Sequence, residues 1–221
     1  KTHLFYSVCV ANGNADSMWN RNAMYVDTAA TGFTAENLTV ENSYDYTNGS
    51  DQQADALCIV ADQTACINVR LIGYQDTLLT DTRTKDENGN YAVTRQYFNK
   101  CYITGNVDFI YGAGTSVFED CDIIHCQYEG NMGGAVISIH QADGGHVHDI
   151  HYKNIRVEQA EQKLFDIKVL LCRYTEQLAK GEINDIYFDN IQVLNGDIPV
   201  SMIRGYQTPT EEVRVHDVHF D

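Results

Sequence analysis

Hydrophobic and polar positions recur along this chain in one short template. The template reads polar, Asn or Asp, aliphatic, any residue, apolar, any residue, Asn, and it occurs at 35–42, 148–157 and 184–193, while 215–221 begins a further copy. Period-two alternation places aliphatic side chains on one face and charged ones on the other, and the β-branched and aromatic residues favour strand over helix. The pattern therefore predicts a strand that repeats.

The spacing of the copies predicts how these strands are arranged. The equivalent aliphatic positions are expected at Leu38, Val69, Cys101, Cys121, Ile150, Ile186 and Val218. Strands of fixed length separated by excursions of variable length are typical of stacked coils, in which each repeat buries its apolar face against its neighbours. We therefore expect an all-β, right-handed parallel β-helix (a solenoid) that forms a single domain over residues 1–221.

Two segments depart from the template. Residues 81–90 are polar and are expected to form a surface loop between two strands, with Asn88-Gly89 as its turn. Segment 163–174 is apolar enough for another strand, and 175–180 fits either a loop or a short helical turn closed by Gly181. Strand followed by loop is the preferred interpretation.

Two acids lie inside apolar, strand-like runs. Asp76 follows Gln75 in the segment 73–78, and Asp108 stands within the segment 102–112. A carboxylate in such surroundings costs free energy unless it is paired, hydrogen-bonded or exposed in a cleft, so both acids are candidates for a functional site. A cap or an Asx turn is the alternative for Asp76.

Three motifs in this part of the chain resemble those of the pectin methylesterase family, the carbohydrate esterases that remove methyl groups from polygalacturonate. They are Gln53-Ala54-Asp55-Ala56-Leu57, Gly73-Tyr74-Gln75-Asp76-Thr77-Leu78, and Tyr102-Ile103-Thr104-Gly105-Asn106-Val107-Asp108-Phe109-Ile110-Tyr111-Gly112. Gln75 stands 22 residues after Gln53 (75 − 53), which is the family spacing, and Tyr111 replaces a Phe of the family. The resemblance covers about residues 25–123.

The resemblance implies that Asp108 is the nucleophile, that Asp76 is the general acid and base, and that Gln53 and Gln75 form the oxyanion hole. The chemistry is coherent, because a preorganised amide donor aimed at a developing oxyanion is worth roughly 10²–10³ in rate. The attacking carboxylate must be ionised while the proton donor to methanol is neutral, so the two pKa values must differ. Repulsion between neighbouring acids separates them in this way.

Aromatic residues next to these acids are candidates for substrate binding. Tyr74, Phe109 and Tyr111 are expected to line a sugar-binding groove, and core packing at strand spacing is the alternative.

The chain departs from the family in one motif that bears on activity. The family's Leu-Gly-Arg-Pro-Trp segment, whose Arg pairs with the nucleophile, is missing, and the remaining candidates are Arg156, Arg173, Arg204 and Arg214, with Arg204 the best placed. The family's early Gly-X-Tyr-X-Glu motif is missing as well. The sequence does not start with Met, and its first residues lead directly into the strand-like run 4–10. We therefore expect a piece of a longer protein.

The C-terminal coils carry a weaker resemblance of their own. Residues 131–221 are more similar to the final coils of β-helical polysaccharide glycosidases, whereas residues 1–130 hold the esterase motifs. Two interpretations stay open: an esterase with unusual closing coils, or a composite of two β-helices.

The composition of the chain limits the classes of partner that we expect. With 15 Lys and Arg against 31 Asp and Glu, the formal charge of −16 disfavours nucleic acid and anionic membranes. No apolar run reaches the length of a membrane span. An acidic groove repels demethylated pectin, so methylated pectin is the expected polysaccharide substrate, and a secreted, extracellular or periplasmic location is expected.

Cysteine and histidine add little chemistry. Cys101 and Cys121 are expected to stack on adjacent coils as free buried thiols, with a disulfide as the alternative. His148 and His151 are an odd number of residues apart and would point to opposite faces of a strand, so neither a metal site nor another cofactor is expected.

Three functions follow from the sequence. The first is a metal-free pectin methylesterase-like hydrolase. The second is a polysaccharide glycosidase with a carboxylate pair, for which separations of ~5–5.5 Å or ~6.5–9.5 Å are expected. The third is a catalytically inactive carbohydrate-binding or scaffold β-helix, which gains if no guanidinium reaches Asp108.

Overall fold

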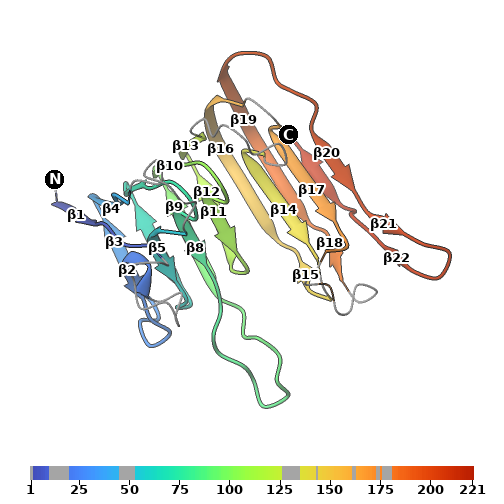
Figure 1. The fold of residues 1–221 in the computed structure, drawn as a ribbon, viewed down its shortest axis with the longest axis horizontal. Coiled ribbons are helices and arrows are strands. Elements are labelled where there is room, and N and C mark those ends of the chain that lie inside the picture. The colour runs from blue at the N-terminus through green and yellow to red at the C-terminus, as the bar shows by residue number, and fades with distance from the viewer. Residues whose placement is uncertain are drawn as a thin grey trace.

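The computed structural model describes residues 2–9, 20–44, 53–125, 135–142, 144–160, 163–172, 175 and 181–221. Within these ranges there is no α-helix, and every pair of strands is parallel except β21 (Tyr206–Gln207) with β22 (Glu212–Val213). The coils stack along the long axis, from the N-terminus at one end to the C-terminal strands at the other (Figure 1). The predicted parallel β-helix is confirmed.

The largest sheet has 12 strands and folds around a corner of the solenoid. On one side of the corner lie β1 (Thr2–Tyr6), β4 (Leu38–Asn42), β7 (Arg70–Ile72), β10 (Tyr102–Gly105) and β13 (Asp122–His125), and on the other β3 (Thr34–Glu36), β6 (Thr64–Ile67), β9 (Arg95–Asn99) and β12 (Thr115–Glu119). The two sides meet in β16 (Ile150–Gln159), which pairs with both β12 and β13 and is followed by β19 (Ile186–Asn195) and β23 (Val218–Phe220).

The remaining wall is divided into two sheets. One contains β2 (Asn22–Val26), β5 (Asp55–Ile59), β8 (Leu78–Thr80) and β11 (Ile110–Gly112), and the other contains β14 (Ile137–Gln141), β17 (Phe165–Val169) and β20 (Met202–Arg204). The two-stranded sheet of β15 (His146–Val147) and β18 (Glu182–Ile183) lies beyond the second of these. No hydrogen-bonded ladder joins β11 to β14 in the described part of the chain.

Asparagine occurs in the template because the described coils share a corner with a left-handed backbone. Asn37, Asn68, Lys100, Asp120, Asn154 and Asn190 precede the aliphatic position on successive coils, and all have φ between 52° and 57°. Asn tolerates this conformation better than most residues. The side chains also bond along the stack, since Nδ2 of Asn68 donates to Oδ1 of Asn37 at 2.7 Å and Asn190 repeats the bond to Asn154 at 2.8 Å.

The register corrects one step of the predicted alignment. Leu38, Val69, Cys101 and Cys121 are equivalent as expected, and so are Ile150, Ile186 and Val218. The step from Cys121 to Ile150 is wrong, because Asp122 pairs with Arg156 and therefore places Ile155 next to Cys121. β16 is a ten-residue strand that carries two aliphatic positions, one on each side of the Asn154 corner, and the sequence template did not distinguish them.

Aromatic rings and thiols fill the interior of the coils. Phe98, Phe118, Tyr152, Phe188 and Phe220 stack in one column, with neighbouring ring centroids 4.7, 5.8, 5.1 and 5.0 Å apart. Cys101 and Cys121 are buried and free, which confirms the first of the two interpretations offered for them.

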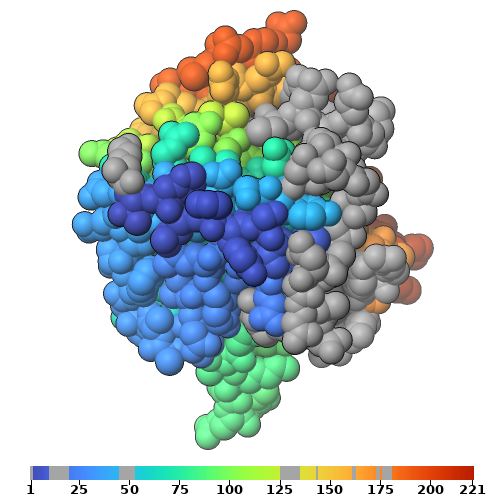
Figure 2. Space-filling model, turned by 60° about the vertical axis from the view of Figure 1, so that its left-hand side comes forward, coloured from blue at the N-terminus to red at the C-terminus, as the bar shows by residue number. Residues whose placement is uncertain are grey.

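The structure describes the first of the two segments that depart from the template and part of the second. The segment 81–90 forms a loop that projects from the stack, with an isolated bridge between Lys85 and Tyr91 and with Gly89 at φ 83° (Figures 1 and 2). β17 confirms the strand expected within 163–174, whereas the helical turn considered for 175–180 lies almost wholly outside the described residues. No helix in the described ranges has the length and hydropathy of a membrane span.

Candidate active site

The register of the divided wall brings three acids into one column. Leu57 pairs with Leu78, and Leu78 pairs with Ile110. Two residues before these partners stand Asp55, Asp76 and Asp108, so the acids lie at the same level on three successive coils about 4.8 Å apart. The amide of Asp76 donates to the carbonyl oxygen of Val107 at 3.0 Å, which keeps the two coils in contact at the acids. The sequence prediction that Asp76 and Asp108 come together is thus matched by the backbone.

Two motif glycines permit this close approach. A Cβ on Gly105 would lie 2.4 Å from Oγ1 of Thr77 and 2.7 Å from the carbonyl oxygen of Tyr74. A Cβ on Gly112, whose φ is 132°, would lie 1.7 Å from the carbonyl oxygen of Thr80. Neither position accepts a side chain, so the glycines of the third motif hold the coil of Asp108 against the coil of Asp76.

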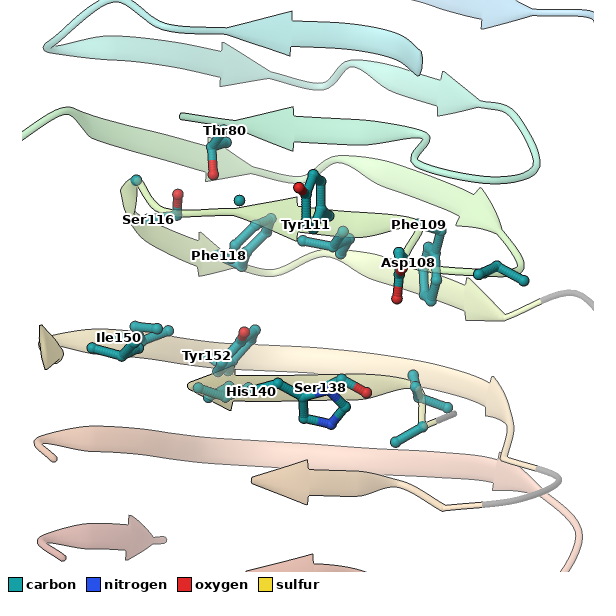
Figure 3. A pocket seen from close by; sticks show the side chains of 18 of the residues that line it. Thr80, Asp108, Phe109, Tyr111, Ser116, Phe118, Ser138, His140, Ile150 and Tyr152 are labelled. Carbon is teal, nitrogen blue, oxygen red and sulfur yellow. The ribbon is translucent and has the colours of Figure 1, made fainter. Parts of the chain in front are cut away.

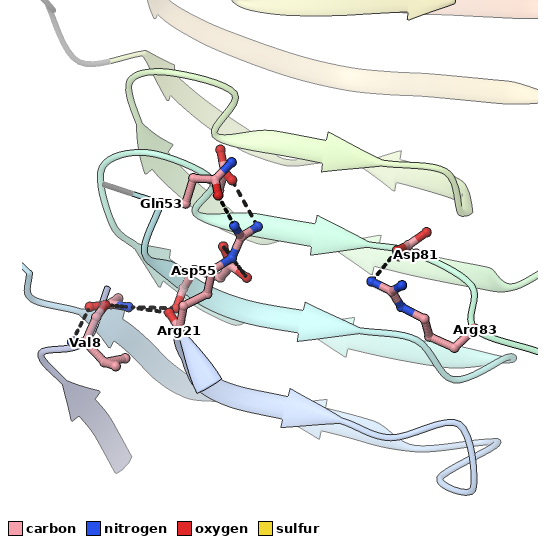
Figure 4. Close-up of polar contacts among 8 residues, drawn as sticks. Val8, Arg21, Gln53, Asp55, Asp81 and Arg83 are labelled. Carbon is pink, nitrogen blue, oxygen red and sulfur yellow. Dashed lines mark hydrogen bonds and ion pairs between the residues drawn. The ribbon is translucent and has the colours of Figure 1, made fainter. Parts of the chain in front are cut away.

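Arg21 is the cation of the site. Its side chain is 4% exposed and lies directly before β2. Nη2 lies 3.1 Å from Oδ2 of Asp76, Nε lies 3.2 Å from both carboxylate oxygens of Asp55, and Nη1 donates to Oε1 of Gln53 (Figure 4). One guanidinium therefore contacts three polar groups on two neighbouring coils.

Asn42 holds the backbone around Arg21. It is 1% exposed, and its Nδ2 donates to the carbonyl oxygens of Val8 at 2.8 Å, Asp55 at 3.0 Å and Arg21 at 3.1 Å. Its Oδ1 accepts from the amide of Val8 at 3.2 Å. The buried amide thus ties three chain segments together and fixes where the guanidinium emerges.

The contact with Arg21 also fixes the orientation of Gln53. A guanidinium has only donors, so the amide atom facing it must be the oxygen, and Nε2 is the donor left for a ligand. Gln75 lies on the next coil, where its carbonyl oxygen accepts from the amide of Ala54 at 3.2 Å. The structure brings the two glutamine segments side by side, while the convergence of their side-chain amides on one oxyanion stays a prediction.

Burial gives the three acids higher pKa values than ordinary carboxylates have. Desolvation raises the pKa of Asp76 to about 8, with Arg21 acting in the opposite direction and the charges of Asp55 and Asp108 adding to the rise. Desolvation raises the pKa of Asp55 to about 7, again opposed by Arg21. The pKa of Asp108 is also raised by desolvation, and His140 acts against that rise.

Asp108 differs from its two neighbours in its access to solvent. Asp55 and Asp76 are 0% and 1% exposed, whereas Asp108 is an exposed residue at a pocket of about 300 Å³. The pocket opens where the wall is divided, with Asp108 and Tyr111 on one side and Ser138 and His140 of β14 on the other (Figure 3). Of the four residues expected to catalyse, Asp108 lines this pocket, whereas Asp76, Gln53 and Gln75 are not among its lining residues.

The aromatic candidates separate into three cases. Tyr111 lines the pocket and is 44% exposed, so it is available to a ligand. Tyr74 is half-buried on the coil before it. Phe109 also lines the pocket but is 2% exposed and belongs to the hydrophobic core, so its role in a sugar-binding groove stays a prediction.

The arginine candidates named from the sequence do not reach Asp108. Arg204 lies on β20, two strands beyond β14, while Arg156 pairs with Asp122 and Arg214 with Glu212. Arg173 lies outside the described residues. Among the residues that the structure describes, no cation forms an ion pair with Asp108. Arg21 was not among these candidates, because the family motif lies downstream of the nucleophile whereas Arg21 lies far upstream and reaches the acids only through the stacking of coils.

Fold and site together define a β-helical protein that stacks carboxylates beside a cleft at the break of one wall. The pectinesterase family model matches residues 7–174, and the chain belongs to this family. A pectinesterase of Sitophilus oryzae is 42% identical over 85 residues, which is 38% of this chain and 20% of that protein. Pectinesterase 31 of Arabidopsis thaliana is 42% identical over 98 residues, 44% of this chain and 26% of that protein. The matched segments therefore span about a quarter or less of these relatives.

Solved structures agree on the fold. Pectin methylesterase from Yersinia enterocolitica superposes with a TM-score of 0.57 at 19% identity, covering 95% of this chain and 81% of that one. Pectin methylesterase from carrot gives a TM-score of 0.52 at 18% identity, with coverages of 98% and 69%. A pectin methylesterase in complex with a hexasaccharide gives 0.56 at 20% identity, with coverages of 85% and 63%.

Proposed function

We propose that this protein is a pectin methylesterase-like hydrolase that removes methyl esters from polygalacturonate, with Asp108 as nucleophile and Asp76 as general acid and base. One observation carries the proposal: the register stacks an exposed acid at a pocket on a buried acid of raised pKa. Near neutral pH the exposed carboxylate is the group able to attack, and the buried carboxyl still carries a proton to give away.

The reaction proceeds in two balanced steps. A carboxylate oxygen of Asp108 bonds to the ester carbonyl carbon, and the resulting oxyanion is stabilised by the side-chain amides of Gln53 and Gln75. Collapse of this intermediate breaks the bond to the methoxy oxygen, which takes the proton of Asp76 and leaves as methanol. Water then attacks the acyl carbon and gives one proton to Asp76, and the bond to Asp108 breaks to release galacturonic acid, which loses its remaining proton to solvent.

Arg21 supports the acid and base role. After donating its proton Asp76 is a buried anion, and the guanidinium at 3.1 Å is the charge that stabilises it. The same side chain holds the oxygen of Gln53, so the proton donor and one arm of the oxyanion hole are positioned by a single residue. This assignment differs from the expectation of a cation paired with the nucleophile.

Specific observations also favour a second function. Asp108 has no cationic ion-pair partner in the described part of the chain, which supports a carbohydrate-binding β-helix without turnover. In that case the pocket would bind a polysaccharide and release nothing. For either function the partner is a polysaccharide, and a secreted, extracellular or periplasmic location follows from the size of such a ligand.

Product analysis separates the candidates. The protein is incubated with highly methylated pectin, and methanol and new reducing ends are measured on the same sample. The proposed esterase releases methanol in proportion to protein and forms no reducing ends. Reducing ends without methanol would identify a glycosidase, and retention of pectin with neither product would identify a binding protein.

A further inference from the structure

The second step of the proposed reaction needs a water molecule that enters through the pocket. After methanol has left, the acyl carbon is attached to Asp108, which lines the pocket. Asp76 takes one proton of the attacking water, but it is 1% exposed and is not among the lining residues. A base on the pocket side would orient this water and accept its other proton.

His140 is the lining residue with the chemistry of such a base. Among the described residues that line the pocket, the titratable ones are Asp108, Tyr111, His140 and Tyr152. Asp108 is acylated at this stage, and desolvation raises the pKa of both tyrosines, so their hydroxyl groups keep their protons. Imidazole is the side chain that most often acts as a general base, because its ordinary pKa lies near neutral pH.

The fold places His140 across the pocket from Asp108. His140 lies on β14, beyond the break in the wall, and its side chain is 36% exposed (Figure 3). Its neighbour Ile139 is buried in the core, so the alternate position of the strand points outward. An acyl group in this pocket of about 300 Å³ therefore has Asp108 on one side and an imidazole on the other.

A buried carboxylate orients the imidazole. Asp166 is 0% exposed on β17, which pairs with β14, and its Oδ2 lies 3.2 Å from Nε2 of His140. Because an ionised carboxylate only accepts hydrogen bonds, Nε2 carries the hydrogen and Nδ1 carries the lone pair. Nδ1 has no hydrogen-bond partner in the described part of the chain, so this nitrogen is left to bind water.

Two lysines set the charge states of this pair. Burial opposes ionisation of Asp166, but hydrogen bonds from Nζ of Lys168 at 2.7 Å and Nζ of Lys163 at 3.1 Å lower its pKa. Desolvation lowers the pKa of His140, and the charge of Lys168 lowers it further, while Asp166 and Asp108 act in the opposite direction. Near neutral pH the pair is therefore a carboxylate and a neutral imidazole that is able to accept a proton.

We propose that His140, held by Asp166, is a further catalytic residue, which orients the hydrolytic water and accepts its second proton. The acyl intermediate belongs to the proposed function, on which this role rests. The water oxygen bonds to the acyl carbon, one proton passes to Asp76 and the other to Nδ1 of His140, and the bond to Asp108 breaks to leave two carboxylates. The imidazolium then loses its proton to solvent. Methanol leaves before this step and does not need His140.

Methanol formed in the first turnover separates this role from a structural one. Rapid-quench measurements on highly methylated pectin resolve the first methanol, released on acylation, from later turnovers that need hydrolysis. We expect His140→Gln to release a burst of about one methanol per protein molecule at the wild-type rate, and then to turn over about 10²-fold more slowly than the wild type. The matched control is His148→Gln, since His148 also pairs with a carboxylate, Oδ2 of Asp149 at 2.6 Å, but is not among the lining residues. Both phases of the control should match the wild type.

Chemical rescue tests the same base independently. His140→Ala leaves room for a small base in the pocket, so added imidazole should restore at least about a tenth of the wild-type steady rate. Imidazole should not change the rate of His148→Ala. Thermal unfolding of each variant checks that the fold is intact.

Three results would overturn this role of His140: a steady rate for His140→Gln within about threefold of the wild type, equal slowing of the burst and of the later turnovers, or no recovery of His140→Ala with imidazole. Failure of the esterase proposal looks different. In that case the wild type releases no methanol even in its first turnover, and the role of His140 falls with the intermediate.

Discussion

At the scale of single residues, the central feature is that one guanidinium contacts two of the three stacked acids. Arg21 contacts Asp55 and Asp76, while Asp108 has only the pocket and His140 near it. Three carboxylates in one column cannot all ionise at low cost, so protons remain on the buried members near neutral pH. Under the proposed function, the column would supply a proton donor and an attacking carboxylate from residues of the same chemical type.

The pH dependence of methanol release follows from this division. The rate is expected to fall at low pH as Asp108 becomes protonated, and to fall again above about pH 8 as Asp76 loses its proton. Replacement of Asp55 by Asn removes one acid whose charge raises the pKa of Asp76, so the upper limb should move to lower pH. Initial rates between pH 4 and pH 10 check both statements, and an upper limb unmoved in Asp55→Asn would contradict the coupling.

The buried acids also make stability depend on pH. Asp55 has a pKa of about 7 in the folded protein against an ordinary value of 3.8, so the folded state holds a proton that the unfolded chain releases. The contribution of this proton to the free energy of unfolding is fully present below about pH 4 and is lost as the pH rises through 7. Urea unfolding should therefore show a larger difference between pH 5 and pH 8 in the wild type than in Asp55→Asn. Equal pH dependence in the two proteins would exclude an elevated pKa at this residue.

Removal of the Arg21 guanidinium should make the stability of the protein depend on pH more strongly. Arg21→Met leaves Asp55 and Asp76 without a cation, a loss of about 3 kcal/mol in stability for a broken buried pair when the acids are ionised. Because both acids become neutral in acid, the loss should be large at pH 8 and small at pH 5. The control is Arg156→Met, whose ion pair with Asp122 is exposed and should cost less than about 1 kcal/mol at either pH.

At the scale of elements, corners and close contacts between coils decide where the site lies. Asp76 and Asp108 have φ of 60° and 49°, so each acid stands where its coil turns, and the glycines of the third motif let the two turns touch. The strands supply the register, and the corner conformation then sets the direction in which the acids leave the wall. The site is thus a property of two adjacent coils.

Gly112→Ala tests this contact between coils. The added Cβ would lie 1.7 Å from the carbonyl oxygen of Thr80, so β11 must move away from β8. We expect methanol release to fall by more than about tenfold, since small displacements of catalytic groups carry large rate penalties. Gly145→Ala is the control, because nothing lies within 4 Å of a Cβ there and its rate should match the wild type. Normal activity in Gly112→Ala would show that β8 and β11 need not be in contact.

At the scale of the whole molecule, the stack behaves as a one-dimensional array. The aromatic column runs from Phe98 to Phe220, so its rings pack against one another through the coils on both sides of the pocket. Each ring contacts mainly its neighbours in the column, so a defect in the middle weakens the connection between the two halves more than either half itself.

Phe118→Ala places such a defect beside the pocket. Phe118 is 2% exposed and stacks on Phe98 and Tyr152, and its truncation should cost about 3–5 kcal/mol. We expect denaturant unfolding to lose cooperativity and to separate into two transitions. Tyr97→Ala, at an exposed position of the adjacent strand, is the control and should retain one transition. A single transition with an unchanged midpoint in Phe118→Ala would refute the role of the column.

Much of this architecture could be predicted from the sequence, because a solenoid encodes its register locally. Asn at the corners and alternating aliphatic positions indicated the coils, and the family resemblance indicated that Asp76 and Asp108 belong to one site. The step after Cys121 failed because Ile150 and Ile155 are both aliphatic positions of one long strand, which local pattern does not separate. Arg21 could not be assigned either, since its contacts with Gln53 and Asp76 join residues 32 and 55 positions apart through the stacking of coils.

The most direct test of the catalytic assignment is methanol release by Asp108→Asn, measured beside Asp149→Asn. Asp149 is the matched control, because it is an exposed acid at a left-handed corner, with φ of 55°, and is not among the residues that line the pocket. We expect a loss of at least about 10³-fold in kcat for Asp108→Asn and a rate equal to the wild type for Asp149→Asn. Methanol release by Asp108→Asn within tenfold of the wild type would contradict it.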